Sequence, residues 1–241
     1  LGLIPISNIF PLDMTIAERW LYFPVIGLLI AFAGLLNFQK RSPKVFIILL
    51  LIAFSIPILS LRTIIRNSNW KDGLTLYSHD IKINKNSFDL ENNLGVELFR
   101  AGEYSQAKEH FERSIKLQPK WHFAYNNLGA VYEREKNYQK AKELYQKTLE
   151  LSDYYLAYEN FASLLLFYEE NAKGAKDFTQ DALKKLPKNP KLWLTLALAE
   201  YKLGENQGAL AAAKTSYLLS PTQEALYVYT RLQQGLPLEF K

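Results

Sequence analysis

The chain has 241 residues, of which 49% are hydrophobic, and it contains no cysteine. Without cysteine, neither a disulfide framework nor a cysteine metal site can form. Residues 1–87 carry nine Lys or Arg and four Asp or Glu, so they account for the whole formal charge of +5. Residues 88–241 are neutral and show no basic stripe with interleaved aromatics, which argues against nucleic acid as a partner.

The first part of the chain has the features of a membrane domain. Residues 20–38 hold 19 residues without a charge, roughly 28 Å as a helix, and residues 45–61 hold 17, roughly 25 Å. Both segments predict transmembrane helices in contact with a lipid bilayer, joined by a basic loop at 39–44. Residues 1–19 are interpreted as an extramembrane loop or the end of a preceding membrane segment. Because the chain begins with Leu1, we expect it to be a fragment with further membrane helices upstream.

Residues 62–87 predict a linker and an orphan capping helix. Beyond them, four alanines recur at a period of 34 residues: Ala107, Ala141, Ala175 and Ala209. A 34-residue repeat of two helices with a small residue at its twentieth position is typical of tetratricopeptide repeats, which stack into a solenoid. We place the four repeats at 88–121, 122–155, 156–189 and 190–221, with a C-terminal capping helix at 222–235. The predicted fold class is therefore all-α, with two transmembrane helices followed by a tetratricopeptide-repeat α-solenoid.

The eighth position of each repeat also carries a small residue: Gly95, Gly129, Ser163 and Ala197. Small side chains at positions eight and twenty predict a close approach of neighbouring helices, because a packed interior tolerates little added volume. Aromatic rings fill position twenty-four of the first two repeats, whereas Thr179 and Ala213 stand there in the last two. The third and fourth repeats therefore match the repeat pattern less closely, so the sequence sets their register but leaves their packing detail open.

Residues 17–27 read AERWLYFPVIG. This stretch resembles the Ala-Glu-Arg-x-Leu-Tyr-x-Pro-x-x-Gly motif of the transmembrane and tetratricopeptide-repeat-containing proteins, which are protein O-mannosyltransferase-like enzymes. The approach to the first repeat is similar too, in Arg66-Asn67, Trp70 and Leu76-Tyr77. The resemblance implies a glycosyltransferase that uses a polyprenyl-phosphate-linked sugar and modifies protein on the outer side of the membrane. It places the catalytic base upstream of Leu1, so no catalytic residue is expected in this chain.

Two residues of that motif, Glu18 and Arg19, are the candidates for a donor site. A guanidinium can give two parallel hydrogen bonds to a phosphate, and the membrane interface is where a polyprenyl phosphate lies. The alternative is that both are ordinary flanking charges of a membrane helix. No cofactor is otherwise evident, and His79, His110 and His122 lack the spacing of a metal site, so no metal is expected.

The repeats carry a second candidate site, for an extended polypeptide. Asparagines recur at the fifth position of three repeats and the sixth of two: Asn92, Asn126, Asn160, Asn93 and Asn127. Such a ladder resembles that of the O-linked N-acetylglucosamine transferase repeats, and each amide can bond a peptide main chain. Phe99, Phe167 and Tyr201, all at position twelve, are expected to add an aromatic wall. The alternative, asparagine retained for solubility, stays open.

Two functions of different class follow from these features. One is the C-terminal part of a membrane glycosyltransferase whose solenoid presents polypeptide to an upstream active site; the other is a non-enzymatic, membrane-anchored scaffold for protein assembly. The basic loop at 39–44 favours the cytoplasmic side for itself and hence an extracytoplasmic solenoid in a multi-pass protein. Basic residues also gather on the opposite side, at Arg19, Arg62, Arg66 and Lys71, so the bias in their number is close to nil. The family resemblance favours the extracytoplasmic side.

Overall fold

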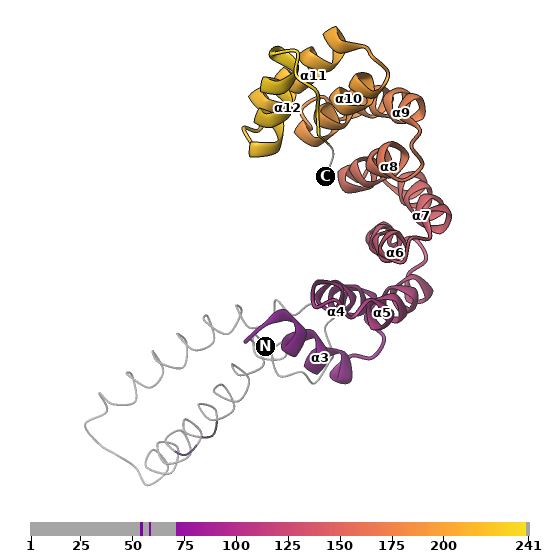
Figure 1. Cartoon of the computed structure of the whole chain (residues 1–241). Coiled ribbons are helices and arrows are strands. Elements are labelled where there is room, and N and C mark those ends of the chain that lie inside the picture. The colour runs from indigo at the N-terminus through magenta and orange to yellow at the C-terminus, as the bar shows by residue number, and fades with distance from the viewer. Residues whose placement is uncertain (1–53, 55–57, 59–70, 240–241) are drawn as a thin grey trace, which may run out of the picture. The chain divides into compact units, whose positions relative to one another are not determined.

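The computed structural model describes residues 54, 58 and 71–239, and the regular structure of residues 71–239 is entirely helical. The helices carry the labels of Figure 1. They are α3 (Gly73–Ile83), α4 (Phe88–Arg100), α5 (Tyr104–Leu117), α6 (His122–Arg134), α7 (Tyr138–Leu151), α8 (Tyr155–Phe167), α9 (Ala172–Lys185), α10 (Pro190–Lys202), α11 (Asn206–Leu219) and α12 (Gln223–Gln233).

The predicted membrane segments fall almost entirely outside this part of the chain. Residues 1–38 and the basic loop at 39–44 are not described, and of the segment 45–61 only Phe54 and Ile58 are, both exposed and helical. Within the described residues, no helix has the length and apolar character needed to cross a bilayer. The two transmembrane helices therefore stay predictions.

The chain divides into two compact units, Leu1–Leu90 and Glu91–Lys241. In the first, α3 begins after Asp72, whose carboxylate accepts a hydrogen bond from the Thr75 N–H at 2.7 Å. The second holds the helical repeats. Each repeat in this unit is a pair of helices. The second helices of the four pairs start at residues 104, 138, 172 and 206, which are 34 residues apart. An all-α solenoid is thus confirmed.

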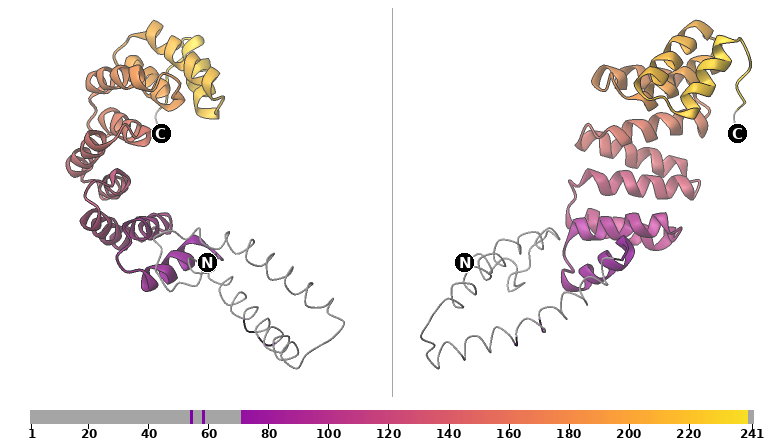
Figure 2. Two further views of the ribbon diagram at one scale, coloured as in Figure 1. Left: turned by 180° about the vertical axis from the view of Figure 1, so that it is seen from behind. Right: turned by 90° about the vertical axis from the view of Figure 1, so that its left-hand side faces the viewer.

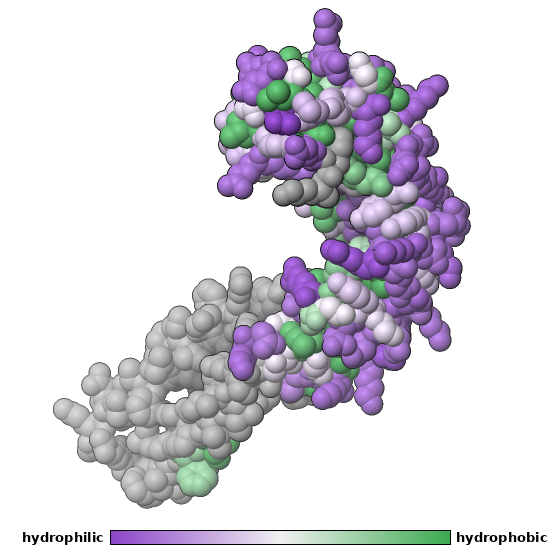
Figure 3. Space-filling model, viewed as in Figure 1, coloured by the Kyte–Doolittle hydropathy of each residue, from purple (hydrophilic) through white to green (hydrophobic). Residues whose placement is uncertain are grey.

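The first helices of the repeats lie on the inner side of this solenoid. In the second unit, α6 contacts α8 and α8 contacts α10, whereas α5, α7, α9 and α11 do not pack closely on one another. Figures 1 and 2 show the resulting arc, with α7 and α9 on its outer side. Hydrophilic side chains cover most of that outer side in Figure 3. The inner surface is therefore built by α4, α6, α8 and α10.

Close contact between the two helices of a repeat depends on small residues. All four alanines of the 34-residue period are fully buried. At Gly129, an added Cβ would lie 2.6 Å from the ring of Tyr145, and at Gly95 it would lie 2.6 Å from the ring of Phe111. The close approach predicted from position eight is therefore confirmed in these two repeats. The last two repeats combine a residue that has a Cβ at position eight with a smaller, fully buried side chain at position twenty-four, namely Ser163 with Thr179 and Ala197 with Ala213.

In the third and fourth repeats the side chain at position eight is larger and the one at position twenty-four is smaller than in the first two, so different side chains fill the same space between the helices. The structure supplies the packing detail that the sequence left open there, because Thr179 and Ala213 are 0% exposed, as Tyr145 is. Tyr145 also needs a partner for its hydroxyl, which donates to Glu133 Oε2 at 2.9 Å. Burial raises the pKa of Tyr145 far above its ordinary value, so the hydroxyl remains a donor at physiological pH.

The turn between the two helices of every repeat contains one residue with a left-handed backbone. These residues are again 34 apart: Gly102 (φ 84), Lys136 (φ 60), Glu170 (φ 50) and Gly204 (φ 77). Glycine adopts this conformation without cost, whereas a residue with a Cβ is strained by about 1 kcal/mol. The turn geometry is therefore set by the packing of the repeat, since it persists where the sequence does not favour it.

We expect Gly129→Ala to lower the free energy of unfolding by about 1–3 kcal/mol, because the new methyl group overlaps the buried Tyr145 ring. This loss would occur although alanine is the better helix former, by about 1 kcal/mol. Urea denaturation of the parent and the variant measures the difference. In a Tyr145→Thr background the same substitution should be neutral or stabilising; an equal loss in both backgrounds would contradict the steric explanation.

Candidate functional site

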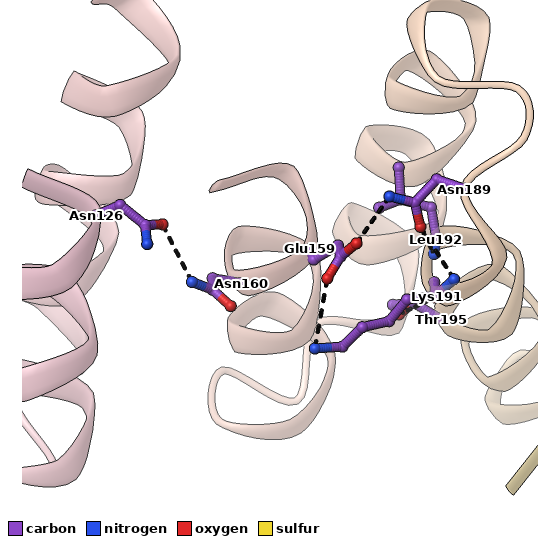
Figure 4. A network of polar contacts seen from close by, with 7 residues as sticks. All are labelled: Asn126, Glu159, Asn160, Asn189, Lys191, Leu192 and Thr195. Carbon is purple, nitrogen blue, oxygen red and sulfur yellow. Dashed lines mark hydrogen bonds and ion pairs between the residues drawn. The ribbon is translucent and has the colours of Figure 1, made fainter. Parts of the chain in front are cut away.

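The predicted asparagine ladder lies on the first helices, and its side chains bond to one another. The Asn160 Nδ2 group donates to Asn126 Oδ1 at 3.1 Å, as Figure 4 shows. Asn126 Nδ2 donates to Asn127 Oδ1 at 3.5 Å, and Asn127 Nδ2 donates to Asn92 Oδ1 at 2.9 Å. Four amides thus form one directed chain from α8 through α6 to α4. This chain links three repeats.

Burial decides how much of this ladder a ligand could reach. Asn92 and Asn126 are only 7% and 4% exposed, while Asn127 and Asn160 are half-buried. A carboxamide has two donor hydrogens and a carbonyl oxygen with two lone pairs, so one bond of each kind leaves capacity unused. Asn160 keeps its carbonyl oxygen, and the half-buried Asn93 side chain forms no hydrogen bond within residues 71–239. Asn160 is therefore the accessible end of the bonded chain, and Asn93, outside that chain, is a second accessible amide.

The buried carboxylate of Glu159 provides the next polar link, from α8 to the start of α10. Glu159 Oε1 accepts from Asn189 Nδ2 at 2.7 Å, and Glu159 Oε2 lies 3.6 Å from Lys191 Nζ (Figure 4). The side-chain oxygen of Asn189, Oδ1, in turn accepts from the N–H groups of Lys191 and Leu192, each at 3.0 Å, and so caps α10. The sequence Asn189-Pro190 is a recognisable helix start. The hydrogen bond from Asn189 to Glu159, 30 residues earlier in the chain, could not be predicted from the sequence.

Aromatic rings gather where α6 and α8 begin. The ring centroids of Phe123 lie 5.0 Å from those of Trp121 and 4.7 Å from those of Tyr154, and Tyr155, half exposed, lies 5.5 Å from Tyr154. His122 packs 4.1 Å from Phe123, and burial lowers the pKa of its imidazole, which favours the neutral form. This cluster, residues 121–123 with 154–155, was missed. The sequence feature that could have indicated this cluster is the 34-residue spacing of Trp121 and Tyr155.

The three predicted residues of the aromatic wall have different surroundings. Phe167 is 42% exposed, with Lys202 Nζ 5.8 Å from its ring centre. Phe99 is half-buried and meets Tyr104 edge-on at 5.2 Å. Tyr201 is half-buried, and its hydroxyl accepts from the Leu238 N–H at 3.1 Å. Of the three, Phe167 is the ring most open to a ligand, and Tyr201 is already engaged by the chain's own C-terminal segment.

Ion pairs that sequence reasoning missed join successive repeats. A lysine follows three of the period alanines directly: Lys108, Lys142 and Lys176. Lys108 Nζ lies 3.2 Å from Glu135, Lys142 Nζ lies 2.9 Å from Glu169, and Lys176 pairs with Glu205. The 34-residue recurrence of these lysines was visible, but their partners lie 27 or 29 residues further on in the next repeat. These pairs fix neighbouring repeats in register.

The candidate donor residues Glu18 and Arg19 lie outside the described residues, so their role stays a prediction. The histidines have separate surroundings: His79 on α3 contacts Asp80, and His110 Nδ1 lies 2.5 Å from Glu91 Oε2 between α5 and α4. In the described part of the chain, no group of three His, Asp or Glu is placed to hold a metal ion.

Comparison with protein-family models identifies the repeats. Two models described as tetratricopeptide repeat match residues 88–120, 122–155 and 160–224, together more than half of the chain. The chain belongs to the tetratricopeptide-repeat family. Its four repeats have the helix pairs of that family, and α12 follows as an unpaired helix in the described residues.

Two relatives of this chain have names that include an activity. The chain is 39% identical over 123 residues to the protein O-mannosyl-transferase TMTC3 of Homo sapiens and 34% identical over 126 residues to the protein O-mannosyl-transferase Tmtc2 of Drosophila melanogaster. Each match covers 49% of this chain and 13% of the relative. The family resemblance indicated by the sequence is thus confirmed over about half of the chain, which spans only a small part of these relatives.

Solved tetratricopeptide structures share the fold at low identity. The chain superposes on YrrB, described as a TPR protein with an unusual peptide-binding site, with a TM-score of 0.53 and 19% identity, covering 66% of this chain and 82% of YrrB. For the APC/C hetero-tetramer Cut9-Hcn1 the TM-score is 0.60 at 18% identity, with 69% and 34% covered. Identities this low establish the solenoid fold alone.

We expect Asn126→Ala to lower the free energy of unfolding by about 1–3 kcal/mol, because it breaks the amide chain at a buried position and removes partners from Asn127 and Asn160. Asn93→Ala is the matched control, since that amide has no side-chain bond to lose, and it should change stability by less than about 0.5 kcal/mol. Thermal and urea unfolding of both variants measures the effect. Equal effects of the two substitutions would show that the amide chain does not stabilise the solenoid.

Proposed function

We propose that this chain is the polypeptide-binding part of a membrane glycosyltransferase related to the protein O-mannosyl-transferases, and that its repeats hold an acceptor polypeptide in extended form. The observation that carries the proposal is the 39% identity to such a transferase. The inner surface of the solenoid supports it, because accessible amides and rings line the first helices. The repeats carry no net charge, which suits recognition of main chain more than of charged side chains.

The spacing of the inner surface suits an extended chain. Packed helices lie about 8–10 Å apart, and an extended polypeptide covers that distance in about three residues. One amide per repeat would therefore meet a main-chain group at every third residue. The Asn93 side chain and Asn160 Oδ1 are available for such bonds, and the exposed Phe167 ring, about two turns further along α8 from Asn160, offers an apolar contact. Side-chain identity at the intervening positions would remain unread.

The membrane domain of this proposal comes from the sequence. Residues 20–38 and 45–61 would cross the bilayer in a multi-pass protein, and the solenoid would lie on the extracytoplasmic side with the polyprenyl-phosphate donor. Arg19 would hold the donor phosphate through paired hydrogen bonds, oriented by Glu18. The sugar transfer itself would be carried out by residues upstream of Leu1.

To test the binding surface, we expect Asn93→Ala combined with Phe167→Ala to weaken binding of an unstructured 15-residue Ser/Thr-rich peptide by about three- to tenfold, because one hydrogen bond and one exposed ring contact are lost. Isothermal titration calorimetry on the folded chain measures it. Gln146→Ala, which removes an exposed amide from α7 on the outer side, is the control and should leave affinity unchanged. Unchanged affinity in the double variant would reject the inner surface as the peptide site.

To test the donor site, we expect Arg19→Ala in the full-length protein to abolish sugar transfer while peptide binding is retained, because the guanidinium binds donor and not acceptor. Transfer of a radiolabelled sugar from polyprenyl phosphate to the same peptide measures the activity. Arg19→Lys keeps the charge but loses the planar pair of hydrogen bonds, so it should retain partial activity. Full transfer by Arg19→Ala would remove Arg19 from the donor site, and a parent protein that binds peptide without transferring sugar would favour the scaffold.

A further inference from the structure

The chain does not end at its last helix but folds back over it. Gly235, with φ +67, turns the chain after α12, and residues 235–239, here called the strap, run back across α12 to α10. Figure 1 shows this segment in yellow beside α12 and α10. The strap is not part of any repeat helix pair.

Three side chains of the solenoid hold the strap by its main chain. The Tyr201 hydroxyl on α10 accepts from the Leu238 N–H at 3.1 Å, and the Tyr227 hydroxyl on α12 accepts from the Glu239 N–H at 3.3 Å. The Arg231 guanidinium donates twice to the Pro237 carbonyl oxygen, at 2.9 and 2.6 Å. Consecutive residues of the strap are thus recognised through groups that every polypeptide has.

One side chain of the strap adds specificity. Leu238 is only 8% exposed and belongs to the same apolar core as Val228 of α12, whereas Leu236 is 40% exposed. Glu239 Oε1 lies 3.9 Å from Arg231 Nη2, a weak, solvent-exposed ion pair. The solenoid therefore buries one leucine side chain of the strap and places a cation beside the residue that follows it.

From these contacts we propose that Tyr201, Tyr227 and Arg231 form a binding site for an extended, leucine-containing polypeptide, and that the strap occupies this site in cis. Tyr201 stands at position twelve of the fourth repeat, in line with Phe167 on the inner surface, so a polypeptide that extends past Phe167 would meet the strap. Such a polypeptide reaches Tyr201 only by displacing residues 235–239. The site itself is defined by the strap and does not depend on sugar transfer or on the amide ladder.

Cis occupancy sets a limit on the affinity in trans. A segment tethered by a short linker has an effective concentration on the order of 1 mM. For the strap to fill its site most of the time, the same sequence supplied as a separate peptide must therefore bind the empty site with a Kd below about 1 mM.

The test uses the chain ended at Gln234 and a capped synthetic peptide with the sequence of residues 234–241, QGLPLEFK. We expect the peptide to bind this shortened chain with a Kd below about 1 mM by NMR titration, and not to bind the parent, whose site is filled. A peptide with Leu238→Asp should bind at least about tenfold more weakly, because a buried leucine contributes about 1.5–3 kcal/mol. No binding to the folded shortened chain at 5 mM peptide, or equal binding to parent and shortened chain, overturns the proposal.

A second measurement covers the case in which the shortened chain does not fold. In the full chain, hydrogen exchange of the Leu238 and Glu239 amides should be slowed relative to the free peptide, and Tyr201→Phe should accelerate exchange at Leu238 by about two- to tenfold while Val228 stays protected. Exchange of both amides in the parent at free-peptide rates would overturn cis occupancy. Slowed exchange that depends on protein concentration would assign the site to the strap of a second copy and overturn it equally.

Discussion

The close contact between the two helices of each repeat is the constraint on which the rest of the structure depends. It requires an alanine with no exposed surface at position twenty and a matched pair at positions eight and twenty-four, such as Gly129 beneath Tyr145. Because packed interiors accept neither a gap nor an extra methyl group, the pair must exchange volume as a unit, as Ser163 and Thr179 do. The starts of the second helices, the left-handed turn residues and the lysines of the inter-repeat ion pairs then recur with the same period of 34.

That packing also decides what the inner surface can offer. First helices that contact one another, such as α6 and α8, bring the polar position-five side chains of successive repeats within hydrogen-bonding distance. A buried amide without a partner is costly, so Asn126 and Asn92 bond to neighbouring amides. The bonded amides therefore stabilise the solenoid, while Asn160 at one end of them and the unbonded Asn93 beside Asn92 stay accessible. A binding surface built this way is rigid before its ligand arrives, which lowers the entropic cost of binding.

The C-terminal end of the solenoid, at α10 and α12, binds one extended segment of the chain itself. At α10 and α12 the strap is held by two tyrosine hydroxyls, by one guanidinium and by the burial of its own Leu238 side chain. The tyrosine hydroxyls bond main-chain groups of the strap. Our proposal assigns main-chain bonding to the accessible amides as well, and both sites would then bind extended polypeptide. Similarity to protein O-mannosyl-transferases is the basis of our proposal that the solenoid holds polypeptide near a sugar transferase.

The sequence by itself determined the architecture, because the spacing of Ala107, Ala141, Ala175 and Ala209 encodes a contact that lies within one repeat and recurs in each. It also located the asparagines on the first helices and indicated the family through residues 17–27. Only the tertiary structure decided which side chains meet across repeats: Asn160 with Asn126, Glu159 with Asn189, Lys142 with Glu169, and Leu238 with Tyr201. Those partners are separated by 27 to 37 residues, and no local periodicity specifies them. Their distances follow from the angle and offset between neighbouring helix pairs, which are set by the packed volume of all the side chains between them.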